Sequence, residues 1–485
     1  NIDGANTNPT FVGVVIRNNR ASGPNADGAG AYVTQGARPT FRGCVFAANV
    51  AGNQGGGLKV LLGAHATVIG GSIRGNRAGA TRGINSGGGG MFVIEASATL
   101  TNVTVERNRA SFVAGGLYIF NRFTSPQRML LVQDSRIRDN VASRLNPNDP
   151  AAQGGGLHVE DNSRLRIVRS EIRGNDADTG GGITNFRGRL EIFHSIVAFN
   201  DGDDPQSLGG FGGGIASFTN DGGRVPTAIL TDTAVVGNTA RIGGGIYHTN
   251  DTGGGNRAPL TLKEALVSDN TTDGGGGGIF LKRAALTMTN RSQVLRNDVG
   301  SGSGGGILLE AGGQATIRGS TIASNTATRG GGVAVVANTI LDVQQNSRIY
   351  GNVARNASGG GGIFVGGVPA TGTVSGNVIA DNVNYQIAET QRANTGITYT
   401  NNKIEDTASP KKIYVGNNPS GSFSTVAGFN SGLSPRASGN TQTGPAFVSF
   451  LATPNFSPSF LAWSVARAAD IDISNLGNNL EAPTG

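Results

Sequence analysis

The stretch "GGGLHVEDNSRLRIVRSEIRGNDAD", residues 154–178, contains the pattern that decides the fold. Three glycines open it, and glycine destabilises the interior of a helix. The residues that follow alternate, with Leu157 and Val159 two positions apart, and a period of two is typical of a β-strand. The stretch passes through Asn175, three residues after Ile172, and a near-copy of the whole pattern begins soon afterwards. The chain therefore repeats one short β-rich unit.

An aliphatic residue or Phe followed three positions later by Asn marks each copy of the unit. The spacing between successive asparagines runs from 25 to 38 residues, which indicates a solenoid. Between the glycine cluster and the Asn lie three short apolar runs, so each unit is predicted to be a coil of about three strands that cannot bury its apolar face alone. The thirteen marker residues are Asn19, Asn49, Asn76, Asn108, Asn140, Asn175, Asn200, Asn238, Asn270, Asn297, Asn325, Asn352 and Asn382.

Other repeat architectures do not fit these units. The Leu-x-x-Leu-x-Leu pattern of a leucine-rich horseshoe is absent, and no apolar period of 3.6 is sustained as helical repeats require. Coils of parallel strands stacked along one axis remain. The sequence predicts an all-β, single-stranded parallel β-helix of about thirteen recognisable coils over residues 1–382. Residues 383–485 are predicted to form an irregular continuation of the β-helix and its cap.

The repeated Asn and Gly residues are interpreted as scaffold. Asn tolerates the left-handed backbone conformation that a sharp coil corner needs, and its amide both donates and accepts hydrogen bonds. Stacked asparagines are therefore expected to form a ladder in which successive amides satisfy one another. The glycine clusters are expected at another corner, where a positive φ or the close approach of the next coil leaves no room for a side chain.

These paired markers, Gly-Gly-x-Ile and aliphatic-or-aromatic-x-x-Asn, resemble the polymorphic outer membrane protein repeats of bacterial autotransporters. The resemblance covers roughly residues 10–382 and implies a right-handed β-helix, exposed on a cell surface and acting in adhesion. Two departures stand out: most copies carry Ile or Val where that family favours Phe, and the sequence up to Gly485 does not predict a C-terminal transmembrane barrel. The tail at residues 439–470 is similar to the end segment of other secreted bacterial β-helix proteins, with its Pro-x-Phe-Val strand.

Composition agrees with an exported repeat protein. The chain has 80 glycines in 485 residues and 15% charged residues, and low complexity with a regular period indicates repeats and not disorder. Its single cysteine, Cys44, cannot form an internal disulfide and is expected in the core. No apolar run approaches the ~20 residues of a spanning helix, so no transmembrane segment is expected in this chain. We expect a secreted or bacterial cell-surface protein without a cofactor.

The chain is basic, with a formal net charge of +7. An arginine directly follows the marker aliphatic in four units, and these residues are candidates for anion binding to acidic glycans or phosphates. The alternative is that they cover the strands with their stems and pair with nearby Asp139, Glu171 and Asp176. No motif suggests nucleic-acid binding, and none is expected. The four candidates are Arg17, Arg74, Arg138 and Arg173.

A stripe of apolar residues is predicted on the outward side of the strand after the glycines. Such a stripe is either covered by another segment of the chain or contacts a partner, such as another copy or a glycan stacked on the rings. The first copy also begins inside a coil, and an uncapped coil could dock head to tail and build a fibre. The candidate contact residues are Phe92, Tyr118, Phe120, Phe186, Phe218, Tyr247, Phe280 and Phe364.

Few residues of the sequence suggest a catalytic site. Parallel β-helices also include polysaccharide lyases and hydrolases, whose chemistry needs clustered carboxylates, or a calcium site with a basic residue. The best acidic group, Asp201, Asp203 and Asp204, is a weak calcium candidate and otherwise a solvated turn. His158 and Glu160 share an outward face near Tyr118, Phe120, Thr184 and Phe186 of flanking coils, without a second carboxylate. No catalytic residue is predicted, and the four histidines lack metal-site spacing.

The sequence therefore favours a non-catalytic extracellular or cell-surface rod that acts in adhesion or as a structural subunit. Its expected partners are further copies of itself, end to end or laterally, or cell-surface glycans. The alternative is a polysaccharide lyase, hydrolase or depolymerase of the pectate-lyase-like β-helix type, whose carboxylates come from different coils and are invisible in linear spacing.

Overall fold

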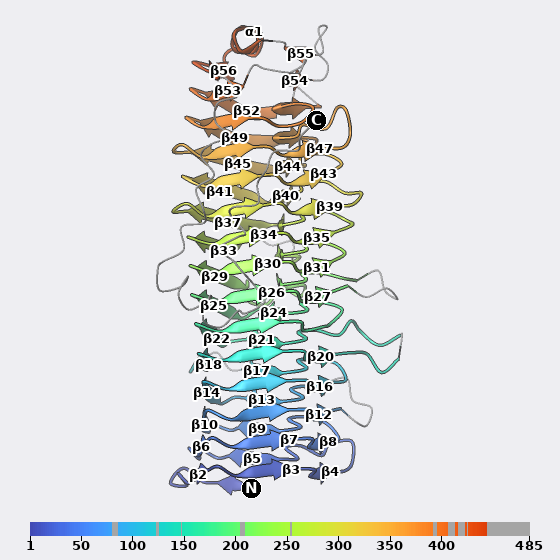
Figure 1. Ribbon diagram of the computed structural model, residues 1–485, viewed down its shortest axis with the longest axis vertical. Coiled ribbons are helices and arrows are strands. Elements are labelled where there is room, and N and C mark those ends of the chain that lie inside the picture. The colour runs from blue at the N-terminus through green and yellow to red at the C-terminus, as the bar shows by residue number, and fades with distance from the viewer. Residues whose placement is uncertain are drawn as a thin grey trace. The chain divides into compact units, whose positions relative to one another are not determined.

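The structure is a computed structural model, which describes residues 1–79, 86–122, 126–146, 148–203, 209–252, 255–390, 395–405, 413–415, 422–423 and 425–443. The chain divides into two compact units: unit 1 is Asn1–Ile229 with Val235–Gly254, and unit 2 is Leu230–Ala234 with Gly255–Gly485. In each unit the successive coils supply one strand to each of three parallel sheets (Figure 1). The predicted parallel β-helix is confirmed.

Unit 1 begins each coil with the strand after the glycine cluster, and these strands form sheet A. They are β1 (Ile2–Asp3), β5 (Ala31–Thr34), β9 (Leu58–Leu61), β13 (Met91–Ile94), β17 (Leu117–Asn121), β21 (Leu157–Asp161), β24 (Ile183–Phe186), β28 (Ile215–Phe218) and β32 (Ile246–Thr249). Sheet B follows with β2 (Thr10–Val12), β6 (Thr40–Arg42), β10 (His65–Ile69), β14 (Ser97–Thr101), β18 (Arg128–Gln133), β22 (Ser163–Val168) and β25 (Arg189–Phe193).

Sheet C of unit 1 contains the strands that end just before the marker Asn. They are β3 (Val15–Arg17), β7 (Val45–Ala47), β11 (Ser72–Arg74), β15 (Thr104–Glu106), β19 (Arg136–Arg138), β23 (Glu171–Arg173) and β26 (Ile196–Ala198). Two-residue strands follow the Asn: β4 (Arg20–Ala21), β8 (Val50–Ala51), β12 (Arg77–Ala78), β16 (Arg109–Ala110), β20 (Val141–Ala142), β27 (Asp201–Gly202) and β31 (Thr239–Ala240). The division between the units falls within β29 (Thr227–Thr231) and β30 (Ala234–Val236).

Unit 2 repeats the arrangement. Its sheet A has β36 (Ile279–Lys282), β40 (Ile307–Glu310), β44 (Val333–Val335), β48 (Ile363–Val365), β51 (Ile387–Glu389), β54 (Ile413–Val415) and β55 (Ser422–Phe423), the last pairing antiparallel. Its sheet B has β33 (Ala258–Lys263), β37 (Ala284–Thr289), β41 (Gln314–Arg318), β45 (Thr339–Gln344), β49 (Ala370–Ser375), β52 (Thr395–Thr400) and β56 (Ala437–Ser438).

Sheet C of unit 2 has β34 (Leu266–Ser268), β38 (Gln293–Leu295), β42 (Thr321–Ala323), β46 (Arg348–Tyr350), β50 (Val378–Ala380), β53 (Lys403–Glu405) and β57 (Thr441–Thr443). The short strands are β35 (Thr271–Thr272), β39 (Asp298–Val299), β43 (Thr326–Ala327) and β47 (Val353–Ala354). Within the described part of the chain, the one helix is α1 (Val426–Gly432), and no helix there is long and apolar enough to cross a membrane.

Strand register stacks like residues in columns and builds the core of each unit. Leu117 pairs with Leu157 and Ile119 with Val159, and all four side chains are fully buried. Parallel pairing without slippage keeps these columns of aliphatic residues on the inner face, because a slip of one residue would turn the whole set outward. Cys44 is buried as a small core residue.

The marker asparagines form a hydrogen-bonded column in each unit. The Nδ2 of Asn108 donates to the Oδ1 of Asn140 at 2.9 Å, and the Nδ2 of Asn140 donates to the Oδ1 of Asn175 at 2.9 Å. The backbone N–H of each Asn donates to that same Oδ1, as Asn108 does at 3.0 Å. In unit 2, Asn297, Asn325, Asn352 and Asn382 repeat the pattern. Buried amides thus satisfy one another from coil to coil.

The left-handed corner residue is not the marker Asn, so that part of the sequence interpretation is wrong. It is the residue directly before the Asn, such as Arg107 with φ 52°, Asp139 with φ 55° or Phe199 with φ 52°. Since such different residues occupy the left-handed position, the corner does not require Asn for its backbone. The Asn is required instead for the hydrogen bonds of its side-chain amide.

A second ladder of small polar residues stands at the corner between sheets B and C. In unit 1 the N–H of Ser135 donates to the Oγ of Ser170, and the N–H of Ser170 donates to the Oγ of Ser195, both at 3.0 Å. In unit 2 the N–H of Asn377 donates to the Oδ1 of Asn402 at 3.1 Å. The ladder was not predicted from the sequence, because its residue changes from serine in most coils to asparagine from Asn377 onward and both types are abundant throughout the chain.

One corner of unit 2 is expected to respond to pH. Burial raises the pKa of Asp381 from 3.8 to about 6, and the charge and hydrogen bond of Glu405 act in the same direction. The folded state therefore keeps a proton that the unfolded chain releases, so the stabilisation is complete below about pH 4 and is lost as the pH rises through about 6. Asp381→Asn should therefore stabilise unit 2 at pH 8 by about 1 kcal/mol, a gain reduced by solvent screening at this half-buried site.

Thermal unfolding followed by circular dichroism at pH 8 and pH 3.5 measures this effect. The variant and the unmodified protein should unfold at the same temperature at pH 3.5, where residue 381 is uncharged in both folded proteins. An equal difference at both pH values would show that the carboxyl pair does not carry the effect.

Candidate functional site

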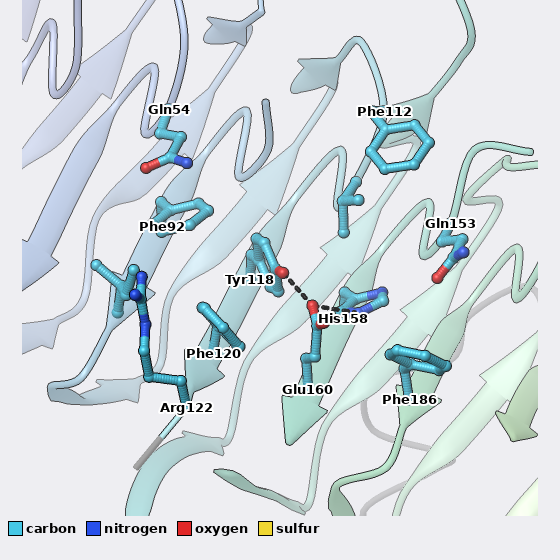
Figure 2. Close-up of a pocket in the computed structure, with 12 residues that line it drawn as sticks. Gln54, Phe92, Phe112, Tyr118, Phe120, Arg122, Gln153, His158, Glu160 and Phe186 are labelled. Carbon is cyan, nitrogen blue, oxygen red and sulfur yellow. Dashed lines mark hydrogen bonds and ion pairs between the residues drawn. The ribbon is translucent and has the colours of Figure 1, made fainter. Parts of the chain in front are cut away.

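A pocket opens on the outer face of sheet A in unit 1 (Figure 2). Its volume is about 470 Å³. Because side chains alternate along a strand, the residues next to the inward Leu117, Ile119 and Val159 point outward from β17 and β21 into it. The residues that line it are Gln54, Phe92, Ile94, Phe112, Val113, Tyr118, Phe120, Arg122, Gln153, His158, Glu160 and Phe186.

One wall of the pocket comes from the segments that precede the glycine clusters. Val113 forms parallel bridges with Gly87 and Gln153 of the adjoining coils, so these segments stack alongside sheet A. Val113 and Phe112 pack against Phe92 and Tyr118. The rings of Phe92 and Tyr118 meet edge to face with centroids 4.7 Å apart. The pocket therefore has an apolar wall with a polar group beside it.

Glu160 lies at the centre of the polar group. Figure 2 shows Tyr118 and His158 both pointing toward its carboxylate, from the neighbouring strands β17 and β21. The hydroxyl of Tyr118 donates to the Oε2 of Glu160, and the Nε2 of His158 lies 3.5 Å from the same oxygen. The other oxygen, Oε1, lies 3.3 Å from the Nη2 of Arg187, whose Nε lies 2.7 Å from the Oδ1 of Asp161. Arg187 also pairs with Asp221.

The environment fixes the protonation of this group. Burial raises the pKa of the Tyr118 hydroxyl well above its usual value, and the charge of Glu160 adds to the rise. Burial also acts to raise the pKa of Glu160, but its contact with His158, the hydrogen bond from Tyr118 and the charge of Arg187 hold it below its usual value. Tyr118 is therefore a hydrogen-bond donor and Glu160 an ionised acceptor at neutral pH.

His158 is the most enclosed polar residue of the pocket. Its side chain is 1% exposed, and its ring meets the Tyr118 ring edge to face with centroids 4.9 Å apart. Its Nδ1 has no hydrogen-bond partner among the residues that the structure describes. Buried polar nitrogens are normally paired, so this atom is an exception among the described residues.

The described lining of the pocket combines a single carboxylate with half-buried aromatic rings. Among the described residues that line the pocket, Glu160 is the only carboxylate, and both of its oxygens already have partners. Glycoside hydrolysis ordinarily uses two carboxyl groups on opposite sides of the scissile bond. By contrast, the half-buried rings of Phe120 and Phe186 line the opening and can stack on the apolar face of a sugar.

The predicted aromatic stripe is largely enclosed. The segments before the glycine clusters lie beside the outward rings, as where Phe211 lies 4.8 Å from Tyr247 between centroids. Three stripe residues, Phe120, Phe186 and Phe218, are half-buried. The buried members are Phe92, Tyr118, Tyr247, Phe280 and Phe364. The chain itself covers much of the stripe, through segments that sequence reasoning did not consider for this role.

The four candidate anion-binding arginines lie in one column of sheet C, but their surroundings differ. Arg138 pairs with Glu106 of the neighbouring coil, with Nη2 and Oε2 2.8 Å apart. The guanidinium of Arg173 lies 5.0 Å from the centre of the Phe199 ring and within 3.9 Å of Glu171. Arg17 and Arg74 are exposed, on either side of Ala47 in the column.

The weak calcium candidate has no metal-site geometry in the described part. Asp201 and Asp203 are exposed, and the N–H of Asp203 donates to the Oδ1 of Asp201 at 2.9 Å. Asp204 lies outside the described residues, as does the tail beyond residue 443 that holds most of the 439–470 similarity. Among the described residues, no three His, Cys, Asp or Glu side chains are grouped as metal ligands.

Comparison with known proteins identifies the fold. A family model described as the right-handed beta helix region matches residues 1–197 and 220–422. Among solved structures, the chain is similar to the crystal structure of the Dettilon tailspike protein (gp208), with 13% identity and a TM-score of 0.28. That match covers 78% of this chain and 62% of the tailspike chain, so the chain spans less than two thirds of its length. No curated protein matches the sequence. Because the family model covers most of the 485 residues, the chain belongs to the right-handed β-helix family.

Proposed function

We propose that the protein is a non-catalytic extracellular or cell-surface β-helix that acts in adhesion by binding a glycan in the pocket on sheet A. The observation that carries this proposal is the pairing of two half-buried rings, Phe120 and Phe186, with a fixed polar group at Glu160. Sugar-binding sites combine aromatic surfaces for the apolar ring face with a few oriented polar groups for the hydroxyls. Gln54 and Gln153 supply further amide groups at the pocket.

The proposal also covers the location of the protein, its C-terminal cap and its self-association. The paired Gly and Asn markers support an autotransporter-passenger-like role and a secreted or bacterial cell-surface location. Strands β51 to β57 and helix α1 support a C-terminal continuation and cap after residue 382. Association between copies, end to end or laterally, including head-to-tail growth of a fibre, is also part of the proposal. Imaging the pure protein for filaments tests this last point.

The second candidate is a polysaccharide lyase, hydrolase or depolymerase. The observation that favours it is the contact of His158 with Glu160 at the pocket, because His and Glu are the residue types most used in acid–base catalysis. A hydrolase would still need a second carboxylate, which the described lining does not provide. Release of reducing or unsaturated ends from acidic and neutral polysaccharides, lost in His158→Ala, would establish this function over the first.

Removing the two half-buried rings of the pocket should weaken glycan binding. The double variant Phe120→Ala/Phe186→Ala is expected to bind about tenfold more weakly, because each aromatic stacking contact contributes ~0.5–1.5 kcal/mol. The measurement is isothermal titration calorimetry, using oligosaccharides selected by screening the unmodified protein on a glycan array.

Phe193→Ala is the matched control, because Phe193 is another half-buried ring of unit 1 that does not line the pocket. It should bind like the unmodified protein. Unchanged affinity in the double variant, or no retained oligosaccharide on the array, would contradict a glycan-binding pocket at this position.

A further inference from the structure

A second surface of unit 1 carries a dense group of arginines at the corner after sheet C. Parallel register arranges them in rows that run from coil to coil. Arg17, Ala47 and Arg74 form one row, and Arg20, Val50, Arg77 and Arg109 form another. Arg107 lies at the corner between the rows. The six residues of this corner arginine patch, all exposed, are Arg17, Arg20, Arg74, Arg77, Arg107 and Arg109.

The positive charges of the patch are hardly neutralised by acidic side chains nearby. None of its six guanidinium groups forms an ion pair or side-chain hydrogen bond with the residues that the structure describes, although Arg109 lies near Asp176. The one carboxylate in the first row, Glu106, is engaged by Arg138 through Nη2 at 2.8 Å and Nε at 3.0 Å. The positive charge of the patch therefore remains available to an external anion.

A hollow of about 390 Å³ lies within the patch. It forms because one coil places the small side chains of Ala47 and Ala48 where the coils on either side place Arg17 and Arg74 around it. Gly75, which has no side chain, extends the floor. The remaining lining residues are Val15, Asn18, Val45, Glu106 and Arg107. The hollow and the positive charges of Arg17, Arg74 and Arg107 thus lie at the same place on the surface.

We infer that this hollow binds a segment of an acidic polysaccharide. A sugar unit occupies the floor over Ala47 and Ala48, and its carboxylate or sulfate groups accept bidentate hydrogen bonds from Arg17 and Arg74. These two arginines stand two strands apart, ~9.6 Å along the stack, so they suit anionic groups repeated along an extended chain. The row of Arg20, Arg77 and Arg109 continues the contact along the same direction.

The chemistry favours a glycan over single-stranded nucleic acid. Single-strand binders add aromatic side chains on which successive bases stack. No aromatic residue is present among the described residues that line the hollow. This surface is also separate from the pocket on sheet A and shares no lining residue with it, so the inference goes beyond the proposed function and does not depend on it.

Binding is measured by fluorescence anisotropy with labelled polygalacturonate (carboxylate) and dextran sulfate (sulfate), and with neutral dextran of matched length. The two acidic polymers show which anionic group is preferred. We expect binding to at least one acidic polymer, a decrease in affinity between 50 mM and 200 mM NaCl, and no binding of neutral dextran. An absence of binding to both acidic polymers at low salt would overturn the inference.

Two variants locate the contact. Arg17→Gln/Arg74→Gln should weaken binding about tenfold, since two exposed ion pairs are lost. Arg38→Gln/Arg224→Gln removes the same charge from exposed arginines outside the patch and should leave affinity within about twofold. Ala47→Leu fills the floor without changing the charge, so it should weaken binding about fivefold if a sugar unit lies there. Equal effects of both arginine pairs, with none from Ala47→Leu, would reduce the interaction to net charge and overturn the site.

Two further measurements distinguish glycan binding at the hollow from nucleic-acid binding and from binding at the pocket on sheet A. A single-stranded DNA oligonucleotide of the same charge should bind more weakly than the acidic glycan, and tighter DNA binding that depends on Arg17 and Arg74 would assign the patch to nucleic acid instead. Phe120→Ala/Phe186→Ala should leave binding of the acidic polymer unchanged. Loss of binding in that variant would place the contact at the pocket and not at the hollow.

Discussion

Gly181→Ala is expected to destabilise unit 1 by more than about 4 kcal/mol, enough to unfold the coils around it. The reason is steric. A Cβ at this position would lie 2.0 Å from the carbonyl oxygen of Asp201 in the next coil and 2.3 Å from its carbonyl carbon. The obstacle is backbone held in a stack of hydrogen bonds, and it cannot rotate away as a side chain can. The measurement is the free energy of unfolding in urea, followed by circular dichroism.

Gly255→Ala is the control for this substitution. A Cβ there meets nothing within 4 Å, and the backbone is not left-handed. Its free energy of unfolding should change by less than about 0.5 kcal/mol, or rise slightly because alanine restricts the unfolded chain. Equal stability of the two variants would show that the coils can separate at Gly181, and that the glycine cluster is not needed for close stacking.

The cluster at 180–182 shows why three consecutive glycines recur. Gly180 has a positive φ of 64°, so the first position needs glycine for its backbone conformation. Gly181 faces the backbone of the next coil, and a Cβ on Gly182 would lie 2.6 Å from the oxygen of Gly214. At this corner, the first glycine is therefore needed for its left-handed backbone, and the other two are needed because the next coil leaves no room for a side chain. Sequence reasoning anticipated both requirements but could not assign them to positions.

The fold was predictable because its determinants are local and periodic. Alternation at Leu157 and Val159 predicted a strand with one buried face, and the spacing of Asn140 and Asn175 predicted that successive coils stack in register. Each signal recurs many times in the chain. Since every coil contacts only its neighbours, knowledge of one repeat extends to the next.

The pocket was harder to predict because it depends on contacts between residues of unrelated types. His158 and Glu160 were recognisable on one outward face, and Tyr118 on a flanking coil. The wall built by Val113 and Gln153 was not, because the stacked segments before the glycines share no residue type. Arg187 was not recognised as the partner of Glu160 for a similar reason: it directly follows β24, outside the alternating strand pattern, and bridges to Glu160.

The error about the left-handed corner has a clear physical origin. Asn is frequent in that conformation, so a recurring Asn at a corner suggests a backbone requirement. The structure separates the two requirements by one residue: Asp139 takes the left-handed conformation with φ 55°, and Asn140 supplies the amide. The repeating Asn therefore indicates a conserved geometry of side-chain hydrogen bonds from coil to coil, and not a left-handed backbone at its own position.

Asn140→Ala should destabilise unit 1 by about 3 kcal/mol or more, because it leaves several buried polar groups without partners. The Oδ1 of Asn140 accepts from the backbone N–H of Asn108 at 3.0 Å and from its Nδ2 at 2.9 Å. Its Nδ2 donates to the Oδ1 of Asn175 at 2.9 Å and to the carbonyl of Val105 at 3.1 Å. Asn140 is fully buried, so water cannot replace these bonds. Unfolding in urea measures the loss.

Two companion variants separate the hydrogen bonds from the volume of the side chain. Asn140→Asp keeps the size and an acceptor for Asn108, but it places a carboxylate oxygen against the Oδ1 of Asn175, so it should also be strongly destabilising. Asn53→Ala, at a half-buried asparagine whose side chain makes no hydrogen bond with the described residues, should change stability by less than about 0.5 kcal/mol. If Asn140→Asp were as stable as the unmodified protein, the donor side of the ladder would contribute nothing, and the column would be held by its acceptors alone.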